Sequence, residues 1–249
     1  MKTVVQNIVT EYEDEGVGPA MLFLHGWQNN LHTFDSLTAL LSSAHRVIRL
    51  DLPGFGKTET PRDVWDLDNY VQFVEDFIQK LKIKVDFLVG HSFGGRIVIK
   101  GNADGKLSAG KIILISSAGI TRNRAFLGSI LRFLFKIGGL ITYIPPLIFW
   151  REKLRKNVYD RIGSDYLGAG VLREIFLKII AEDLTQSAKE ITVPVLLIWG
   201  EGDAITPLAD GELMSKLIFN SVLKAIGGAG HFVHQEKSGE VADLIKDFL

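Results

Sequence analysis

The stretch LVGHSFGGR, residues 88–96, places a serine between glycines where an apolar run ends and an amphipathic segment begins. Its central part, GHSFG (90–94), fits the pattern G-x-S-x-G. In that pattern the serine sits on a sharp strand-to-helix turn, and the flanking glycines remove side chains that would collide with neighbouring elements. The motif therefore predicts a buried strand, then a strained turn that exposes the Ser92 hydroxyl, and then a helix.

Ser92 also has a simpler explanation, because serine is common at helix N-termini and caps them without any catalysis. A capping serine, however, does not require a glycine two residues before it and another two residues after it. The position of the motif at the end of an apolar run therefore favours a nucleophile. A serine hydroxyl is weakly nucleophilic, so a base, and an acid that orients the base, must come from elsewhere in the chain.

A candidate acid follows a later apolar run, in LLIWGEGDAITP (196–207). Asp203 lies in the loop of this stretch and has a better loop position than its neighbours Glu201 and Asp210. An aspartate shortly before Thr-Pro is also a frequent turn or capping residue. We expect Asp203 to be the acid because of its place in the order of the motifs.

A candidate base lies in the glycine-rich stretch GGAGHFVHQEKS (227–238). His231 falls in the loop after the last expected strand, whereas His234 falls at the start of the last helix, so His231 is favoured as the base. His91 is too close to Ser92 in the sequence to reach its hydroxyl as a base. The predicted triad is thus Ser92, Asp203 and His231, in that chain order.

The motif lies within a regular alternation of strand-like and helix-like segments. Short apolar, β-branched runs cover residues 20–25, 45–51, 85–91, 111–117, 193–200 and 221–227. Amphipathic segments typical of helices cover about 33–43, 67–82, 93–103, 208–218 and 238–249. This alternation predicts an α/β fold with a mainly parallel, eight-stranded sheet and helices on both of its faces. Two further strands, at roughly 3–6 and 8–13, have no helix between them and should form an antiparallel edge.

Residues 118–188 interrupt the alternation, because no convincing strand occurs there although the spacing is several times a usual crossover. We expect a helical cap at 118–188, inserted into a core domain formed by residues 1–117 and 189–249.

The first half of the expected cap contains a long apolar stretch, residues 125–150. Arg132 and Lys136 interrupt this stretch, and the Pro145-Pro146 pair would break any helix. We therefore expect no stable membrane insertion.

Composition excludes several classes of function. The formal net charge is -1, from 28 basic and 29 acidic residues, so no global field would attract nucleic acid. The chain has no cysteine, and its first residues contain no apolar signal-peptide core, which favours a cytoplasmic location. Metal-binding and dinucleotide motifs are not found, and GFGKT (54–58) lacks the upstream glycine of a phosphate-binding loop. We expect no metal and no cofactor.

The order Ser, Asp, His and the motif GHSFG are those of the α/β-hydrolase fold superfamily, which the chain resembles over nearly its full length outside the cap. Two further stretches, LFLHGWQNN (22–30) and LDLPGFGKTETP (50–61), also resemble the family's signatures. The first resembles its oxyanion loop, although a glycine there could also simply end a strand. The resemblance implies that the backbone N–H groups of Trp27 and Phe93 stabilise the oxyanion of the reaction.

The resemblance implies a serine hydrolase that cleaves carboxylic esters of small to medium apolar substrates through an acyl-enzyme, with a cap that selects the substrate. The expected partner is thus a small ester, and the protein is expected to be a monomer or homodimer. Candidate substrate contacts are Trp27, His91, Arg96, Trp150 and Phe232.

Two other functions remain open on the same fold. Arg96 completes an S-x-G-G-R pattern that resembles a lyase of the menaquinone pathway, and carbon–carbon bond hydrolases also use serine with a similar cap. A structural role for Arg96, bonded to nearby carbonyls, is the alternative to substrate binding. A ligand-binding protein that has lost turnover is the third possibility.

Overall fold

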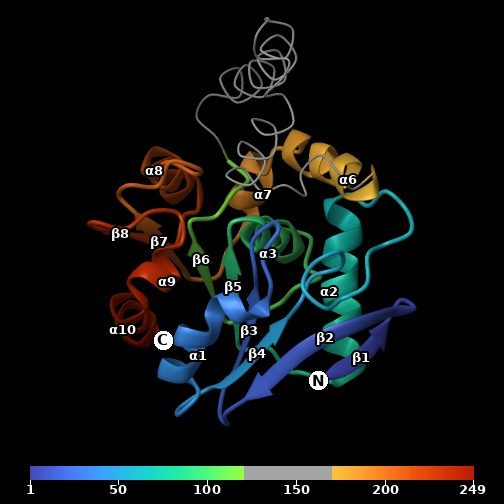
Figure 1. Cartoon of the computed structure of the whole chain (residues 1–249). Coiled ribbons are helices and arrows are strands. Elements are labelled where there is room, and N and C mark those ends of the chain that lie inside the picture. Colours follow the sequence, from blue (N-terminus) through green and yellow to red (C-terminus); the bar gives the residue numbers. More distant parts are fainter. Residues whose placement is uncertain (121–169) are drawn as a thin grey trace, which may run out of the picture.

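The computed structural model describes residues 1–120 and 170–249, and its centre is one eight-stranded sheet in the order β1-β2-β4-β3-β5-β6-β7-β8 (Figure 1). The strands are β1 (Lys2–Val5), β2 (Ile8–Glu15), β3 (Ala20–Leu24), β4 (Arg46–Leu50), β5 (Phe87–His91), β6 (Lys111–Ile115), β7 (Val195–Gly200) and β8 (Ser221–Ile226). β2 pairs antiparallel with both β1 and β4, and all the other neighbours pair in parallel. The sheet therefore confirms the predicted fold, including its antiparallel edge.

Helices cover both faces of this sheet, as its apolar strands require. The helical elements are η1 (Leu31–Phe34), α1 (Asp35–Leu41), α2 (Leu67–Leu81), α3 (Phe93–Ala103), α6 (Gly170–Ala181), α7 (Thr185–Glu190), α8 (Leu208–Leu217), α9 (Val233–Glu236) and α10 (Ser238–Phe248). In β3, Leu22 and Leu24 belong to the core shared with α2 and α3, whereas Met21 and Phe23 belong to the core shared with α1 and α10. This alternation explains why the strand is apolar at every position.

Helix α2 shows how local sequence sets an element's limits. The Asp66 side chain accepts a hydrogen bond from the Asn69 backbone N–H, and the Asn69 side chain accepts one from Asp66, which closes a capping box. Tyr70 and Phe77 on its buried face are fully covered. The helix ends at Leu81, and Lys82 after it takes a left-handed conformation with φ of 51°. The predicted range 67–82 agrees with this helix.

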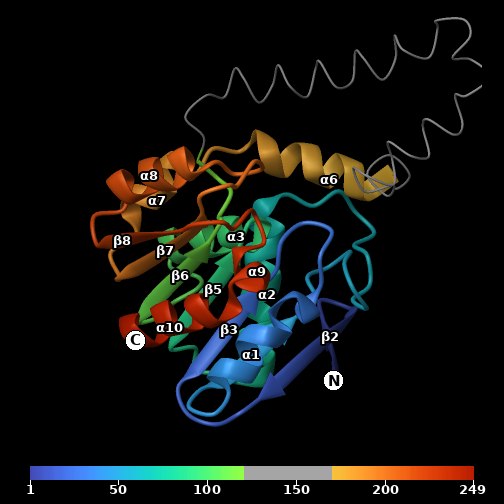
Figure 2. The same ribbon diagram turned by 60° about the vertical axis from the view of Figure 1, so that its left-hand side comes forward.

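Most of the predicted cap, including Trp150, lies outside the described residues. Its described remainder contains α6 and α7, and α6 runs across the edge where the parallel strands end (Figures 1 and 2). Ile175 and Ile179 of α6 are buried in the same core as α2 and α3. The proposed boundaries of the cap stay a prediction. No helix in the described ranges is both long and apolar enough to cross a membrane.

Candidate active site

Ser92 lies between β5 and α3 with φ of 51° and ψ of -109°, a left-handed conformation that is strained for serine. The tight turn brings backbone segments very close together. A Cβ atom at Gly90 would lie 2.7 Å from the backbone of Gly95, and one at Gly94 would lie 2.0 Å from the carbonyl oxygen of Leu24. Neither position can carry a side chain, which accounts for both glycines of the motif.

Asp203, in the loop after β7, meets His231, in the loop after β8. The Nδ1 atom of His231 lies 2.9 Å from Oδ2 of Asp203. His231 is only 8% exposed and Asp203 only 5%. A carboxylate only accepts hydrogen bonds, so Nδ1 of His231 carries the proton and Nε2 keeps its lone pair. That tautomer is the one a general base requires.

The carboxylate of Asp203 accepts further hydrogen bonds from its own loop. Oδ1 accepts from the backbone N–H groups of Ile205 and Thr206, both at 2.9 Å, and Oδ2 accepts from the Thr206 hydroxyl at 2.9 Å. Burial alone would raise the pKa of Asp203, but the bonds with His231 and Thr206 outweigh burial and lower the pKa below its usual value. Asp203 is therefore ionised near neutral pH.

Thr206 was not identified from the sequence, although it contacts both members of the pair. Its hydroxyl lies 3.2 Å from Nδ1 of His231 and 3.1 Å from the carbonyl oxygen of Ser116. The sequence feature that could have indicated Thr206 is the spacing Asp-x-x-Thr in the loop. This spacing is typical of an aspartate that accepts hydrogen bonds from the N–H groups just after it. The same turn that explains Asp203 as a structural residue thus also orients it towards His231.

The elbow and the histidine loop adjoin each other. The rings of His91 and His231 lie 4.9 Å apart between centroids, and His91 directly precedes Ser92. Both side-chain hydrogen bonds of His231 involve Nδ1, so among the described residues none joins its ring to the Ser92 hydroxyl. Catalytic bonds of this kind often tighten only when substrate binds. Nε2 is thus the nitrogen left for Ser92.

The segment after β3 runs directly against the elbow. A Cβ atom at Gly26 would lie 3.3 Å from Cβ of Ser92 and 3.1 Å from Cδ2 of His91. Trp27 follows Gly26, and its ring lies 5.4 Å from that of Phe93. Phe93 begins α3, and the first N–H groups of a helix have no partner within it. The two predicted oxyanion donors therefore belong to segments that meet at Ser92.

His25 holds this segment against the loop after β4. Its Nδ1 donates to the carbonyl oxygen of Gly26 at 2.7 Å, and its Nε2 accepts from the backbone N–H of Leu52 at 2.9 Å. Burial lowers the pKa of His25 to about 4, so the imidazole is neutral near pH 7. Both ring nitrogens are satisfied only in this neutral form.

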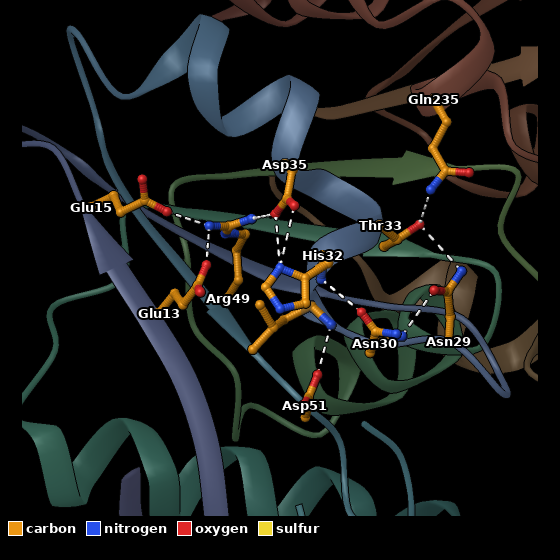
Figure 3. Close-up of polar contacts among 11 residues, drawn as sticks. Glu13, Glu15, Asn29, Asn30, His32, Thr33, Asp35, Arg49, Asp51 and Gln235 are labelled. Atoms are coloured by element: carbon orange, nitrogen blue, oxygen red, sulfur yellow. Dashed lines mark hydrogen bonds and ion pairs between the residues drawn. The ribbon is translucent and has the colours of Figure 1, made fainter. Parts of the chain in front are cut away.

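Asp51 joins the same two loops through their backbones, and Figure 3 shows its bond to the loop after β3. One carboxylate oxygen accepts from the N–H of Leu31 at 2.7 Å, and the other accepts from the N–H of Lys57 at 2.7 Å. Gly56 approaches so closely, with φ of +57°, that a Cβ atom there would overlap the carboxylate. The GFG stretch is therefore a turn built around Asp51, in keeping with the rejection of a phosphate-binding loop.

A cavity of about 220 Å³ opens between these loops and α6. It is lined by Trp27, Gln28, Asn29, Asn30, Gly54, Phe55, Gly56, Leu172, Arg173, Phe176 and Leu177. The Trp27 ring lies 4.8 Å from that of Phe55 and 5.0 Å from that of Phe176, so aromatic groups from three segments meet at the cavity. Trp27 thus lines this cavity and also directly follows Gly26, which approaches Ser92.

Comparison with known proteins identifies the family. The family model described as "Alpha/beta hydrolase family" matches residues 21–244. This chain belongs to the alpha/beta hydrolase family. The hydrolase YugF of Bacillus subtilis, which is uncharacterized, is 26% identical over 98% of this chain and 94% of its own length.

Solved structures share the fold of this hydrolase. A membrane phospholipase A superposes with a TM-score of 0.81 at 21% identity, over 100% of this chain and 84% of that one. Est816, described as an N-acyl homoserine lactone degrading enzyme, gives a TM-score of 0.77 at 21% identity, with 100% of both chains covered. At this level of identity the likeness establishes the fold.

In this hydrolase Arg96 lies far more in the protein interior than its candidate role in substrate binding requires. It is 6% exposed, and its Nη2 donates to the carbonyl oxygens of Ile179 and Glu182 at 2.5 and 2.6 Å. These carbonyls belong to the C-terminal end of α6 and the residues just after it. The contacts favour the structural alternative, in which Arg96 ties the end of α6 to the helix that Ser92 opens.

Two other candidate substrate contacts differ in exposure. Phe232 is 38% exposed, and its ring lies 5.4 Å from that of His231, at the rim of the site. His91 is fully buried, which favours a supporting role behind Ser92 over contact with a ligand. Substrate binding by Phe232 stays a prediction.

One group of side chains has the composition of a metal site. Possible ligand atoms of Glu13, His32 and Asp35 all lie within 4.8 Å of one another (Figure 3). The guanidinium of Arg49, which is 3% exposed, forms ion pairs with Glu13, Glu15 and Asp35. A buried cation thus already occupies the space among the carboxylates, and the cluster joins β2, β4 and α1.

Proposed function

We propose that this protein is a serine hydrolase that cleaves carboxylic esters of small to medium apolar substrates through an acyl-enzyme. The observation that carries the proposal is the buried hydrogen bond between Asp203 and His231, in a loop that adjoins the strained turn of Ser92. Such a bond fixes the imidazole in the tautomer that accepts a proton from serine.

The reaction would proceed in two halves. Oγ of Ser92 bonds to the ester carbonyl carbon while its proton passes to Nε2 of His231, and the oxygen that becomes negative accepts hydrogen bonds from the N–H groups of Trp27 and Phe93. The bond to the alcohol oxygen then breaks, and the alcohol leaves with the proton from His231. Water, deprotonated by the same imidazole, attacks the acyl-enzyme, releases the carboxylic acid and restores the Ser92 hydroxyl.

One part of the cavity has apolar side chains, which supports an apolar substrate, and the rest is lined by Gln28, Asn29, Asn30 and Arg173. Trp27, Phe55 and Phe176 present aromatic rings to it, and Leu172 adds an aliphatic side chain from α6. Its volume of about 220 Å³ suits one substituent of a small or medium ester. Two proteins that share the fold are described as a phospholipase A and as an N-acyl homoserine lactone degrading enzyme. Phospholipids and lactones both contain a carboxylic ester.

The lyase alternative depended mainly on Arg96. Because its guanidinium binds carbonyls at the end of α6, the resemblance in S-x-G-G-R gives less support to a site for a carboxylate-bearing substrate. A carbon–carbon bond hydrolase would use the same Ser92, Asp203 and His231, so only substrate comparison separates it from an esterase.

The first test compares the native chain with Ser92→Ala, using a fluorophosphonate probe and a short-chain aryl ester. We expect labelling and turnover in the native chain and loss of both in the variant, with turnover lowered by about five to six orders of magnitude. Thermal unfolding of both proteins checks that the fold is intact. A native chain that takes no label and hydrolyses no ester would favour the ligand-binding protein.

The second test offers the native chain aryl esters alongside carboxylate-bearing dienes and β-diketones. The proposal expects the esters to turn over fastest. Turnover of the carboxylate-bearing compounds alone would overturn it in favour of the carbon–carbon hydrolase or lyase.

A further inference from the structure

Three imidazoles are packed together behind Ser92. The ring of His91 lies 4.9 Å from that of His231 and 4.3 Å from that of His234, between centroids. His91 and His234 are both fully buried. The mechanism uses only His231, so two buried imidazoles beside the base remain without a role.

Thr33 connects His234 to the segment of Trp27. Its hydroxyl lies 2.8 Å from Nε2 of His234, 3.0 Å from Nε2 of Gln235 and 3.2 Å from Nδ2 of Asn29. Figure 3 shows Asn29 and Gln235 reaching Thr33 from opposite sides. Asn29 lies two residues after Trp27, whereas His234 and Gln235 lie just after His231. A single hydroxyl therefore joins the oxyanion segment to the histidine loop.

The hydrogen-bond donors and acceptors around Thr33 fix the tautomer of His234. Amide nitrogens only donate, so the bonds from Asn29 and Gln235 occupy both lone pairs of the Thr33 oxygen. The one hydroxyl proton must then point to Nε2 of His234. Neutral His234 consequently carries its own proton on Nδ1.

His91 has the same tautomer as His234. Its Nδ1 lies 3.1 Å from the carbonyl oxygen of Ile115, which can only accept, so Nδ1 carries the proton and Nε2 has the lone pair. Nε2 of His91 and Nδ1 of His234 are buried and have no hydrogen-bond partner among the described residues. One of these atoms is a donor and the other an acceptor, on rings that lie 4.3 Å apart.

Both imidazoles are kept neutral by their surroundings. Burial lowers the pKa of His234 to about 3, and burial together with the charges of His234 and His231 lowers the pKa of His91 well below its usual value. Neither ring can therefore take the proton that His231 accepts from Ser92 near neutral pH.

We infer that Thr33, His234 and His91 are positioning residues that hold the loop of His231 against the segment of Trp27. This inference rests on the proposed function, because it concerns the relative placement of the base and the oxyanion donors. The ring of His91 packs against that of His234, with centroids 4.3 Å apart, and its Nδ1 donates to the carbonyl oxygen of Ile115. The hydrogen bonds of this network join Asn29 and Gln235 through Thr33 to His234, and a ring contact continues it to His91.

The test uses pairs of variants that differ in one hydrogen-bonding group. Thr33→Val removes the hydroxyl and Thr33→Ser retains it, while His234→Phe removes the acceptor and His234→Gln offers an amide oxygen near Nε2. For a short aryl ester, we expect Thr33→Val and His234→Phe to lower kcat by about tenfold to a hundredfold, with KM nearly unchanged, because a small misplacement of reacting groups has effects of this size. Thr33→Ser and His234→Gln should recover most of the native kcat.

Thr38→Val is the matched control. Thr38 lies on α1, is 3% exposed, and its hydroxyl has no partner among the described residues. This variant removes a buried hydroxyl near Thr33 without touching the network, so its kcat should equal that of the native chain.

Two results would overturn the inference. If Thr33→Val and His234→Phe unfold at lower temperature but keep the native kcat, the network has only a structural role. If Thr33→Ser is as slow as Thr33→Val, and His234→Gln is as slow as His234→Phe, the hydrogen bonds do not set the rate. A native chain without Ser92-dependent turnover would instead overturn the proposed function, and this inference with it.

Discussion

The loop of His231 and the segment of Trp27 meet at Ser92, but they are held by different interactions. Asp203 binds the imidazole itself, the group that the proposed mechanism uses as its base. His25 and Asp51 bind backbone groups of the oxyanion segment and of its neighbouring loop. On one side of the site the contacts fix a titratable side chain, and on the other side they fix the backbone. Substitutions on the two sides should differ in kind.

The largest effect is expected on the side of the base. Asp203→Asn keeps the shape of the side chain but favours the wrong tautomer of His231, so kcat should fall by about four orders of magnitude. Steady-state hydrolysis of an aryl ester measures this, with circular dichroism to check the fold. A loss of less than about tenfold would mean that Asp203 is the structural turn residue that its sequence context also allows.

A smaller loss is expected on the oxyanion side. Gly26→Ala would bring a Cβ atom to 3.1 Å from His91 and 3.3 Å from Ser92, so the segment must shift. Losing the alignment of one oxyanion donor lowers kcat by about a hundredfold to a thousandfold. Gly239→Ala on α10 is the control, because a Cβ atom there meets nothing within 4 Å. Equal activity of the two variants would show that the segment at Gly26 does not contribute to catalysis.

Stability should respond most on the side that holds the main chain. Asp51→Asn weakens two bonds from backbone N–H groups to a buried carboxylate, and the free energy of unfolding should fall by about 2 kcal/mol. The control is Asp243→Asn, whose carboxylate is 78% exposed and paired with Lys246, and which should change stability by less than about 0.5 kcal/mol. Urea unfolding at pH 7 measures both, and similar midpoints for the two would contradict the role of Asp51.

Acid should destabilise the folded protein because His25 and His234 are buried in their neutral forms. The pKa values of His25 and His234 fall from 6.5 in the unfolded chain to about 4 and about 3 in the folded protein. As the pH drops below 6.5, the unfolded chain takes up protons that the folded chain refuses, so stability is complete above that pH and declines towards pH 4. Each histidine contributes about 1 kcal/mol per pH unit to this decline.

The measurement is urea unfolding between pH 7.5 and pH 4.5. His234→Phe should lose its share of the slope, about 1 kcal/mol per pH unit. An unchanged slope in His234→Phe would mean that His234 is not buried in its neutral form.

The sheet was predictable because its evidence is local. Strands buried on both faces are apolar at nearly every position, and GHSFG demands its turn whatever surrounds it. The order Ser, Asp, His then indicated Asp203 and His231, which the structure joins by a hydrogen bond. A pattern in a single chain was sufficient for these features.

The contacts that support the site were not predictable in the same way. Thr33 and His234 are 201 residues apart, and nothing in either neighbourhood indicates that they meet. The position of Arg96, four residues after Ser92, indicates the helix it occupies but not the carbonyls it faces. Such contacts depend on how loops from distant strands approach one another at the end of the sheet, which composition and spacing do not encode.

The division of the cavity between two kinds of element has a practical consequence for engineering. Its floor consists of loops fixed by Asp51 and His25, while Leu172, Phe176 and Leu177 reach it from one turn after another of α6. A small combinatorial library at these three helix positions would therefore change the cavity and leave Ser92, Asp203 and His231 untouched. Such a library should retain Arg96, since this anchor of α6 lies on α3, the helix that begins directly after Ser92.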